Sequence, residues 1–346
     1  MKKLDPGRTL DSVKAFPKQL KQIWQETKKL KLSTNYQKAK NLVLAGMGGS
    51  ALGGRIVKSL FENQLRIPFQ LVTEYQLPKF VNSESLVIVA SYSGNTEETL
   101  ACLSEAQKRK AMIFGLTTGG KLAEKIKKGL PGMIFKPKFN FLGYPKTAIG
   151  YSLGALIGFL AKSGFIQLTD SQFEKALKEF EKVDLESAAK KIAANFQDKI
   201  SVVVSSEHLN GAAWAFRNQI NEIAHYYSLF FVIPAMNHHL VEAFSQPEGA
   251  KKGLCYLFFR SNQYFSRNQQ RYQISQQLLN QQKIKNWEYA LQSQNKLAQV
   301  LEIVQLGGLT AVYLSFLNQQ DPGPEPWIIY FKKSLKKQLT AYEKKR

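Results

Sequence analysis

The sequence is poor in cysteine and in acidic residues, and it lacks a long apolar run. Among 346 residues the two cysteines, Cys102 and Cys255, lie far apart without CxxC spacing, so neither a disulfide scaffold nor a thiolate zinc site is expected. A reducing compartment, the cytoplasm, is the expected location. The longest apolar run, residues 148–161, falls short of the ~20 residues that a membrane-spanning helix requires. We therefore interpret it as a buried core helix and expect no membrane partner.

The shortage of acidic residues makes the chain strongly basic. It has 48 Lys and Arg against 26 Asp and Glu, a formal charge of +22, which makes nucleic acid, anionic lipid or a phosphorylated metabolite the first partners to consider. No basic segment carries the interleaved aromatics of a single-strand platform, and no Cys/His finger spacing occurs. Lysines scattered over solvated helix faces produce the same total without any binding function, and nucleic acid remains a minor hypothesis. Residues 1–16 lack an apolar stretch behind their lysines, so no secretory signal is expected.

From residue 41 onward, short apolar runs rich in β-formers alternate with helix-length segments. The order strand, helix, strand predicts parallel sheets flanked by helices. The first half is predicted to contain strands at 42–45, 69–75, 86–90 and 111–118, and the second half at 200–206, 229–234, 253–260 and, more weakly, 287–292.

The length predicts about two domains. We place an N-terminal helical arm at residues 1–40, a first α/β domain at 41–165 and a second at 166–346. No Pro-rich or Ser-rich linker separates the halves, so the two domains are expected to pack closely.

A first candidate site is the glycine-rich run GMGGSALGG at residues 46–54, directly after a predicted strand. Glycines let the backbone approach a ligand, and the N–H groups that open the next helix attract a phosphate. The same run also satisfies the dinucleotide fingerprint, and Glu74 ends the next strand where a ribose-binding acid would lie. An NAD enzyme is therefore a rival reading of this motif.

A second candidate site, SYSGNTEET at residues 91–99, follows another predicted strand. Its hydroxyls and glycine supply the many donors that a terminal phosphate needs. The alternative is that residues 93–96 only cap the following helix, because Asn and Thr are preferred caps and Glu97 and Glu98 suit a first turn. The two readings are compatible.

With these motifs the chain resembles the sugar isomerase (SIS) fold and, over residues 41–335, the bifunctional phosphoglucose/phosphomannose isomerases. The resemblance is carried by the two loops above, the pair Asn221 and Glu222, the P-x-x-N-H run at 234–238 and the tail DPGPEPWIIYFK at 321–332. It implies two three-layer α/β/α domains of SIS type with mostly parallel sheets. It also implies an aldose–ketose isomerase of carbohydrate metabolism, active in glycolysis and gluconeogenesis, that interconverts glucose 6-phosphate and fructose 6-phosphate, with mannose 6-phosphate as a further substrate.

The resemblance also implies roles for individual residues. Glu222 would move the proton between C1 and C2, His238 would open the sugar ring, and Lys332 would lie near the ring oxygen. The sugar phosphate would be held by Gly49, Ser50, Ser91, Ser93 and Thr96. Such chemistry needs a base, a ring-opening group and positive charge near the enediolate, and it needs no metal or other cofactor. The resemblance further implies a homodimer in which His238 crosses to the other subunit.

The sequence departs from the family pattern at three places. Lys146 follows Pro145 where the family has an arginine that stabilises enediolate charge, which replaces a bidentate fork by a point charge. The run at 234–240 lacks both of the family's acids, and Glu222 is followed by Ile-Ala-His rather than Asn-Ala-Lys. These departures support a second hypothesis, a sugar-phosphate-binding sensor or regulator with impaired catalysis.

Overall fold

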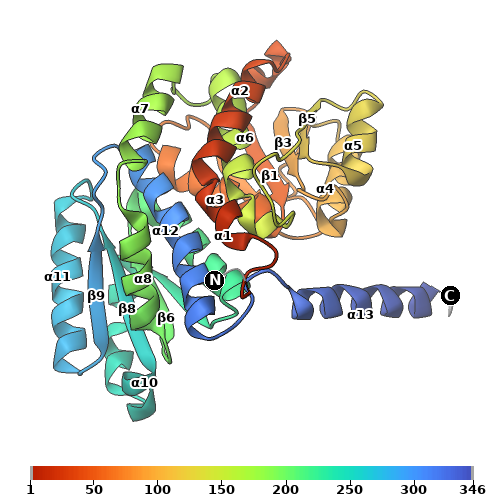
Figure 1. Ribbon diagram of the computed structural model, residues 1–346. Coiled ribbons are helices and arrows are strands. Elements are labelled where there is room, and N and C mark those ends of the chain that lie inside the picture. The colour runs from red at the N-terminus through yellow and green to blue at the C-terminus, as the bar shows by residue number, and fades with distance from the viewer. Residues whose placement is uncertain (1–2, 344–346) are drawn as a thin grey trace.

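The computed structural model describes residues 3–343 of the chain. Figure 1 shows two α/β units side by side, with helices packed between them and the last helix projecting away from both. Each unit is built on a parallel sheet, as the alternation of strand and helix in the sequence predicts.

The first sheet has five parallel strands in the order β2-β1-β3-β4-β5. In the register of β1 and β3, Gly46 lies opposite Ala90, so the loops that follow these two strands are neighbours. The strands are β1 (Asn41–Gly46), β2 (Phe69–Val72), β3 (Ser85–Ala90), β4 (Met112–Thr117) and β5 (Gly132–Ile134).

Alternate side chains of this sheet face two different helix layers. Along β1, Leu42 and Leu44 belong to one apolar cluster, whereas Val43 and Ala45 belong to another, as the period of two in a strand requires. The first face packs on α3 (Gly48–Phe61) and α6 (Ile149–Lys162), and the second on α4 (Glu97–Lys108) and α5 (Gly120–Lys127). The result is a three-layer α/β/α unit.

The second sheet has four parallel strands in the order β7-β6-β8-β9. Helix α9 packs on β6 and β7, and α11 packs on β8 and β9. The strands are β6 (Ile200–Ser205), β7 (Ser228–Val232), β8 (Leu254–Arg260) and β9 (Lys285–Ala290). The helices are α7 (Asp170–Phe180), α8 (Leu185–Phe196), α9 (Asn210–Ile223), α10 (Glu248–Gly253), α11 (Ser266–Gln281) and α12 (Lys296–Leu317).

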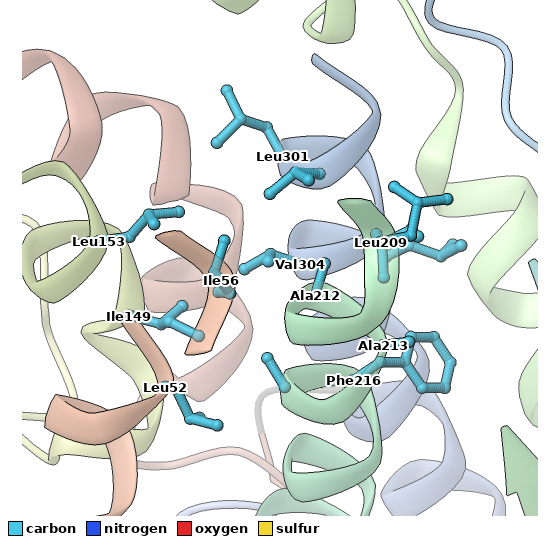
Figure 2. Close-up of a cluster of buried hydrophobic side chains, with 14 of the residues drawn as sticks. Leu52, Ile56, Ile149, Leu153, Leu209, Ala212, Ala213, Phe216, Leu301 and Val304 are labelled. Atoms are coloured by element: carbon cyan, nitrogen blue, oxygen red, sulfur yellow. The ribbon is translucent and has the colours of Figure 1, made fainter. Parts of the chain in front are cut away.

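The two units share one apolar core. Figure 2 shows side chains of α3 and α6 meeting those of α9 and α12, among them Ile56, Leu153 and Val304. Gly211 on α9 lies so close to α3 that a Cβ atom there would overlap the backbone of Arg55 and Ile56. This close approach holds the start of α9 against the middle of α3, and both helices carry candidate site residues.

The N-terminal residues form α1 (Thr9–Lys14), α2 (Phe16–Lys28) and a short 3-10 turn, η1 (Thr34–Lys38). Helix α2 packs along α6, and α1 contacts α12. Helix α12 is long and apolar enough to span a membrane, but 83% of its most apolar window is buried inside the protein. The predicted helical arm is thus helical and packed on both units, while the domain boundaries at 40 and 165 stay predictions.

The other short turns are η2 (Pro145–Thr147), η3 (Glu207–Leu209), η4 (Ala235–His238) and η5 (Val241–Ser245). Helix α13 (Pro326–Glu343) ends the described part of the chain and projects from the molecule in Figure 1. Its first turns expose large apolar side chains, with Trp327 at 80% and Phe331 at 66% of full exposure.

Candidate functional site

The glycine-rich loop and the hydroxyl-rich loop follow adjacent strands, β1 and β3. In the order β2-β1-β3-β4-β5 the chain direction across the sheet reverses between these two strands. Ligands of open α/β sheets bind outside the carboxyl ends of the strands at such a switch point. The topology therefore places residues 47–50 and 91–96 where a ligand is expected.

Hydrogen bonds join the two loops into one hydroxyl cluster, which we define as Ser50, Ser91, Ser93 and Thr96. The Tyr92 backbone N–H donates to Ser50 Oγ at 3.0 Å. The hydroxyls of Ser91 and Thr96 lie 2.8 Å apart, and Ser91 Oγ also accepts from the Gly94 N–H at 3.0 Å. The Ser50 hydroxyl of the first motif thus contacts the backbone of the second motif at the residue after Ser91.

Capping does not use the hydroxyl of Thr96. Thr96 is the residue that precedes α4, but its side chain makes no capping hydrogen bond, and Ser93 is exposed. The first N–H groups of α4 and the positive end of its dipole therefore face the cluster together with the hydroxyls. Such an arrangement can bind an anionic group such as a phosphate.

Gly94 fixes the shape of the hydroxyl-rich loop. Its φ of +71° lies in the left-handed region, and a Cβ atom there would overlap the carbonyl oxygen of Gly119 in the loop after β4. Both constraints require glycine at this position.

The glycine-rich loop also touches the segment that carries Lys146. A Cβ atom on Gly49 would lie 3.2 Å from the carbonyl oxygen of Pro145, so the two backbones are in close contact. Because Lys146 is the next residue, a continuous path of contacts connects the hydroxyl cluster with the lysine.

Lys146 is buried at the junction of three chain segments, and its side chain is 1% exposed. Its Nζ donates to the backbone carbonyl oxygens of Glu222 at 3.1 Å, Pro322 at 3.0 Å and Pro324 at 3.5 Å. It also lies 3.8 Å from a carboxylate oxygen of Glu325. Burial lowers the pKa of Lys146, and the negative charges of nearby acids, Glu325 foremost, counteract this effect.

Glu222, in the last turn of α9, is the most strongly perturbed acid of this junction. Burial raises its pKa from the ordinary 4.5 to about 7, and the like charge of Glu325 acts in the same direction. The cations of Lys146, Arg217 and Lys332 act in the opposite direction. A carboxyl group with a pKa near neutrality can both accept and return a proton at physiological pH.

Arg217 is a charge that the sequence reasoning missed. It lies one and a half turns before Glu222 on α9 and is half-buried. Its guanidinium lies 4.6 Å from the centroid of the Trp214 ring, against which Arg55 of α3 also packs at 4.2 Å. It shares a predicted helix with Glu222, but a separation of five residues does not place two side chains on one face.

The remaining predicted residues lie differently. Lys332, on the exposed helix α13, is close enough for its charge to act on Glu222. His238 ends η4 just beyond edge strand β7 and is exposed to solvent. The structure therefore brings Gly49, Lys146, Glu222 and Lys332 to one junction, beside the hydroxyl cluster, and leaves His238 on the surface.

Two segments of the chain match models of known protein families. Residues 185–335 match the model of the bacterial phospho-glucose isomerase C-terminal SIS domain. Residues 35–125 match the SIS domain model. The first of these segments includes all four strands of the second sheet, and the other includes strands β1 to β4 of the first sheet.

Individual proteins resemble the chain over most of its length. A bifunctional phosphoglucose/phosphomannose isomerase of Caldicellulosiruptor bescii is 28% identical over 94% of this chain and 98% of its own. One of Aquifex aeolicus is 31% identical over 86% of this chain and 91% of its own. The solved structure of a hypothetical protein from Thermus thermophilus has a TM-score of 0.74 at 17% identity, covering 98% of this chain and 92% of that one, and it supports the fold alone.

Proposed function

The chain belongs to the bifunctional phosphoglucose/phosphomannose isomerase family, and we propose that it is an aldose–ketose isomerase of sugar 6-phosphates. It interconverts fructose 6-phosphate with glucose 6-phosphate, and mannose 6-phosphate is the second aldose to be tested. The observation that supports this most directly is Glu222, a carboxyl group with a pKa of about 7 whose backbone carbonyl accepts from Lys146, at the end of the contact path from the hydroxyl cluster.

We propose that the hydroxyl cluster binds the phosphate and Glu222 handles the carbon-bound proton. The hydroxyls and the first N–H groups of α4 offer the several donors that three phosphate oxygens need. Glu222 takes the proton from one of the carbons C1 and C2 and returns it to the other, with the enediolate between the two steps, while the hydroxyl proton moves between O1 and O2. The raised pKa suits this task because the same group must act as base and then as acid.

The enediolate carries negative charge, and the cations near Glu222 stabilise it. Arg217 and Lys332 both act on Glu222 through their charges, which supports their presence near the reacting carbons. The sensor hypothesis, in which catalysis is impaired, is not favoured because the base and its surrounding cations are present.

One assay tests the activity. Purified protein is incubated with fructose 6-phosphate, and glucose 6-phosphate and mannose 6-phosphate are quantified separately. In deuterated water the product should carry deuterium on the carbon that received the proton, because the proton on Glu222 exchanges with solvent. Glu222→Gln, which binds but cannot take the proton, should lose a factor of about 10²–10⁴ in turnover. Binding of fructose 6-phosphate without turnover by the wild type would revive the sensor hypothesis.

We propose a homodimer in which His238 of one subunit reaches the site of the other. His238 is exposed at the end of β7, an edge strand whose apolar side chains at 229–232 are only partly buried. Trp327 and Phe331 on α13 are likewise uncovered. Surfaces of this kind are normally covered in an assembly, and a second copy would cover both while supplying the ring-opening histidine.

Mixing two inactive variants tests this arrangement. Glu222→Gln and His238→Ala each remove one partner of every site, but a mixed dimer with crossing histidines has one intact site. Random exchange of equal amounts should restore about a quarter of the wild-type activity. The opposite finding, stable mixed dimers without recovery, would place His238 in the site of its own subunit.

We further propose that the protein acts in the cytoplasm, without nucleic acid or membrane as a partner. Cys102 and Cys255 are both free and buried, which suits a reducing compartment. Fractionation of the source cells, with the protein expected in the soluble fraction at physiological salt, tests this proposal.

A further inference from the structure

Glu325 is an acid to which neither the motifs nor the family resemblance gives a role. It lies in the turn between α12 and α13, directly before Pro326, the first residue of α13. Its side chain is 14% exposed, and a carboxylate oxygen lies 3.8 Å from Lys146 Nζ. An acid buried to this degree beside a buried lysine requires an explanation.

The donors of Lys146 are occupied by the protein. An ammonium group has three N–H donors, and three carbonyl oxygens, those of Glu222, Pro322 and Pro324, lie within 3.5 Å of this one. No N–H is left over for a substrate oxygen in this arrangement. Lys146 therefore joins the end of α9 to the turn that precedes α13, which differs from the role that the family resemblance implies for this position.

The turn before α13 is tied to the end of α9 by a further contact. His225, the second residue after α9, hydrogen-bonds the carbonyl oxygen of Pro324 through Nε2 at 2.9 Å. Inside the turn, Asp321 accepts from the Gly323 N–H at 2.8 Å. The turn before α13 is thus held beside the end of α9, which carries Glu222, even though the rest of α13 projects from the molecule.

Resting on the proposed isomerase function, we propose that Glu325 is a positioning residue that acts on the base. Ion-paired with Lys146, it fastens the Lys332-bearing helix beside Glu222 and holds a second negative charge next to that carboxyl group. Glu222 and Glu325 then lie near the same positive charges, and of the two only Glu222 carries the substrate proton.

The charged groups around Glu222 determine how a substitution of one of them should shift the ionisation of Glu222. Lys146 of η2, Arg217 of α9 and Lys332 of α13 favour its ionised form, whereas Glu325 opposes it. Asp321 acts on Lys146. Removal of Glu325 should therefore make Glu222 easier to ionise, and removal of Lys146 should make it harder.

The experiment compares pH–rate profiles of the wild type with those of Glu325→Gln, Glu325→Asp and Lys146→Met. The acid limb of kcat should move to lower pH in Glu325→Gln by about half a pH unit or more, and to higher pH in Lys146→Met. Glu325→Asp keeps the charge and should stay near the wild-type profile. KM for fructose 6-phosphate should change little in Glu325→Gln, because the phosphate is held elsewhere. Glu124→Gln, an exposed acid on α5, is the matched control.

Two results would overturn the proposal. One is a loss of activity in Glu325→Gln that is equal at all pH values, since this indicates a purely structural role. The other is a shift of the same sign in Glu325→Gln and Lys146→Met.

Failure of the isomerase function itself can be told apart from failure of the coupling. If the wild type has no isomerase activity, the effect of Glu325 on the ionisation of Glu222 is measured from the free energy of unfolding instead. The difference in unfolding free energy between the wild type and Glu222→Gln depends on pH, and this dependence should move to lower pH when both proteins also carry Glu325→Gln. Such a shift would support the effect of Glu325 on Glu222 even though the isomerase function fails. Its absence would reject both proposals.

Discussion

The raised pKa of Glu222 predicts an unusual dependence of stability on pH. A pKa of about 7 in the folded protein, against an ordinary 4.5, means that the folded state binds a proton between these values while the unfolded state has already lost it. Below pH 4.5 the group is protonated in both states and costs nothing. As the pH rises through 7 the folded state must hold the charge, so stability falls with pH rather than rising.

The size of the effect follows from the pKa difference. At about 1.36 kcal/mol for each unit of pKa, the penalty at pH 8 is about 3 kcal/mol, and the partial exposure of Glu222 makes this an upper figure. Glu222→Gln removes the charge and keeps the shape. The variant should be as stable as the wild type near pH 4.5 and more stable by up to about 3 kcal/mol at pH 8.

Calorimetric unfolding of both proteins between pH 4.5 and 8 measures this difference. The informative quantity is its change with pH, because any constant offset from the amide cancels. Glu124→Gln, at an exposed position, should show no comparable trend. A difference that is flat across the range, or that grows as the pH falls, would falsify the raised pKa and with it the argument for Glu222 as a proton carrier near neutral pH.

Three further changes test the site and the surface. Ser93→Ala with Thr96→Ala removes two hydrogen bonds to a charged group, each worth roughly 1.5–3 kcal/mol, so calorimetric titration should show at least a ~100-fold weaker affinity for fructose 6-phosphate. Gly94→Ala should distort the same loop and lower the Tm, because φ is positive and the Cβ would meet the Gly119 carbonyl; weaker phosphate binding together with a lower Tm would support this, and unchanged binding would contradict it. Trp327→Asp with Phe331→Asp should shift the protein from dimer to monomer in light scattering, and an unaltered dimer would show that α13 lies outside the interface.

The parallel sheets could be predicted from the sequence because their strands are short apolar runs that alternate with helix-length segments. The predicted strand at 42–45 corresponds to β1 (Asn41–Gly46), and even the weaker candidate at 287–292 overlaps β9 (Lys285–Ala290). Strand β5 (Gly132–Ile134) was missed because three residues after a proline are too short for a period of two to appear. Helix α10 (Glu248–Gly253) was also missed, since none of its residues is buried and it has no apolar face.

One part of the site, the two loops, could be predicted from the sequence, whereas the contact between Lys146 and Glu325 could not. Loops that follow adjacent parallel strands must lie together, so the meeting of Ser50 with residues 91–96 can be expected from the strand order. The contact between Lys146 and Glu325 depends on where a turn much later in the chain returns to the first domain, and no local pattern encodes that. Glu325 lies within the motif at 321–332, but its role emerges only from the packing around the lysine.

The packing also indicates how the departure at position 146 changes the site. The resemblance implies an arginine whose fork faces the enediolate, whereas the shorter Lys146 has its three donors on backbone carbonyls and its charge beside Glu325. Positive charge for the enediolate must then come from groups with free donors. Among the residues that the structure describes, the buried Nε of Arg217 finds no hydrogen-bond partner, and Lys332 is exposed on α13; both act on Glu222. A buried, unpaired guanidinium donor is costly unless a ligand satisfies it, so Arg217 is the group whose hydrogen bonding has most to gain from a bound anion. We therefore propose that in this chain Arg217 of α9 and Lys332 of α13 stabilise the enediolate, while Lys146 joins the end of α9 to the turn before α13.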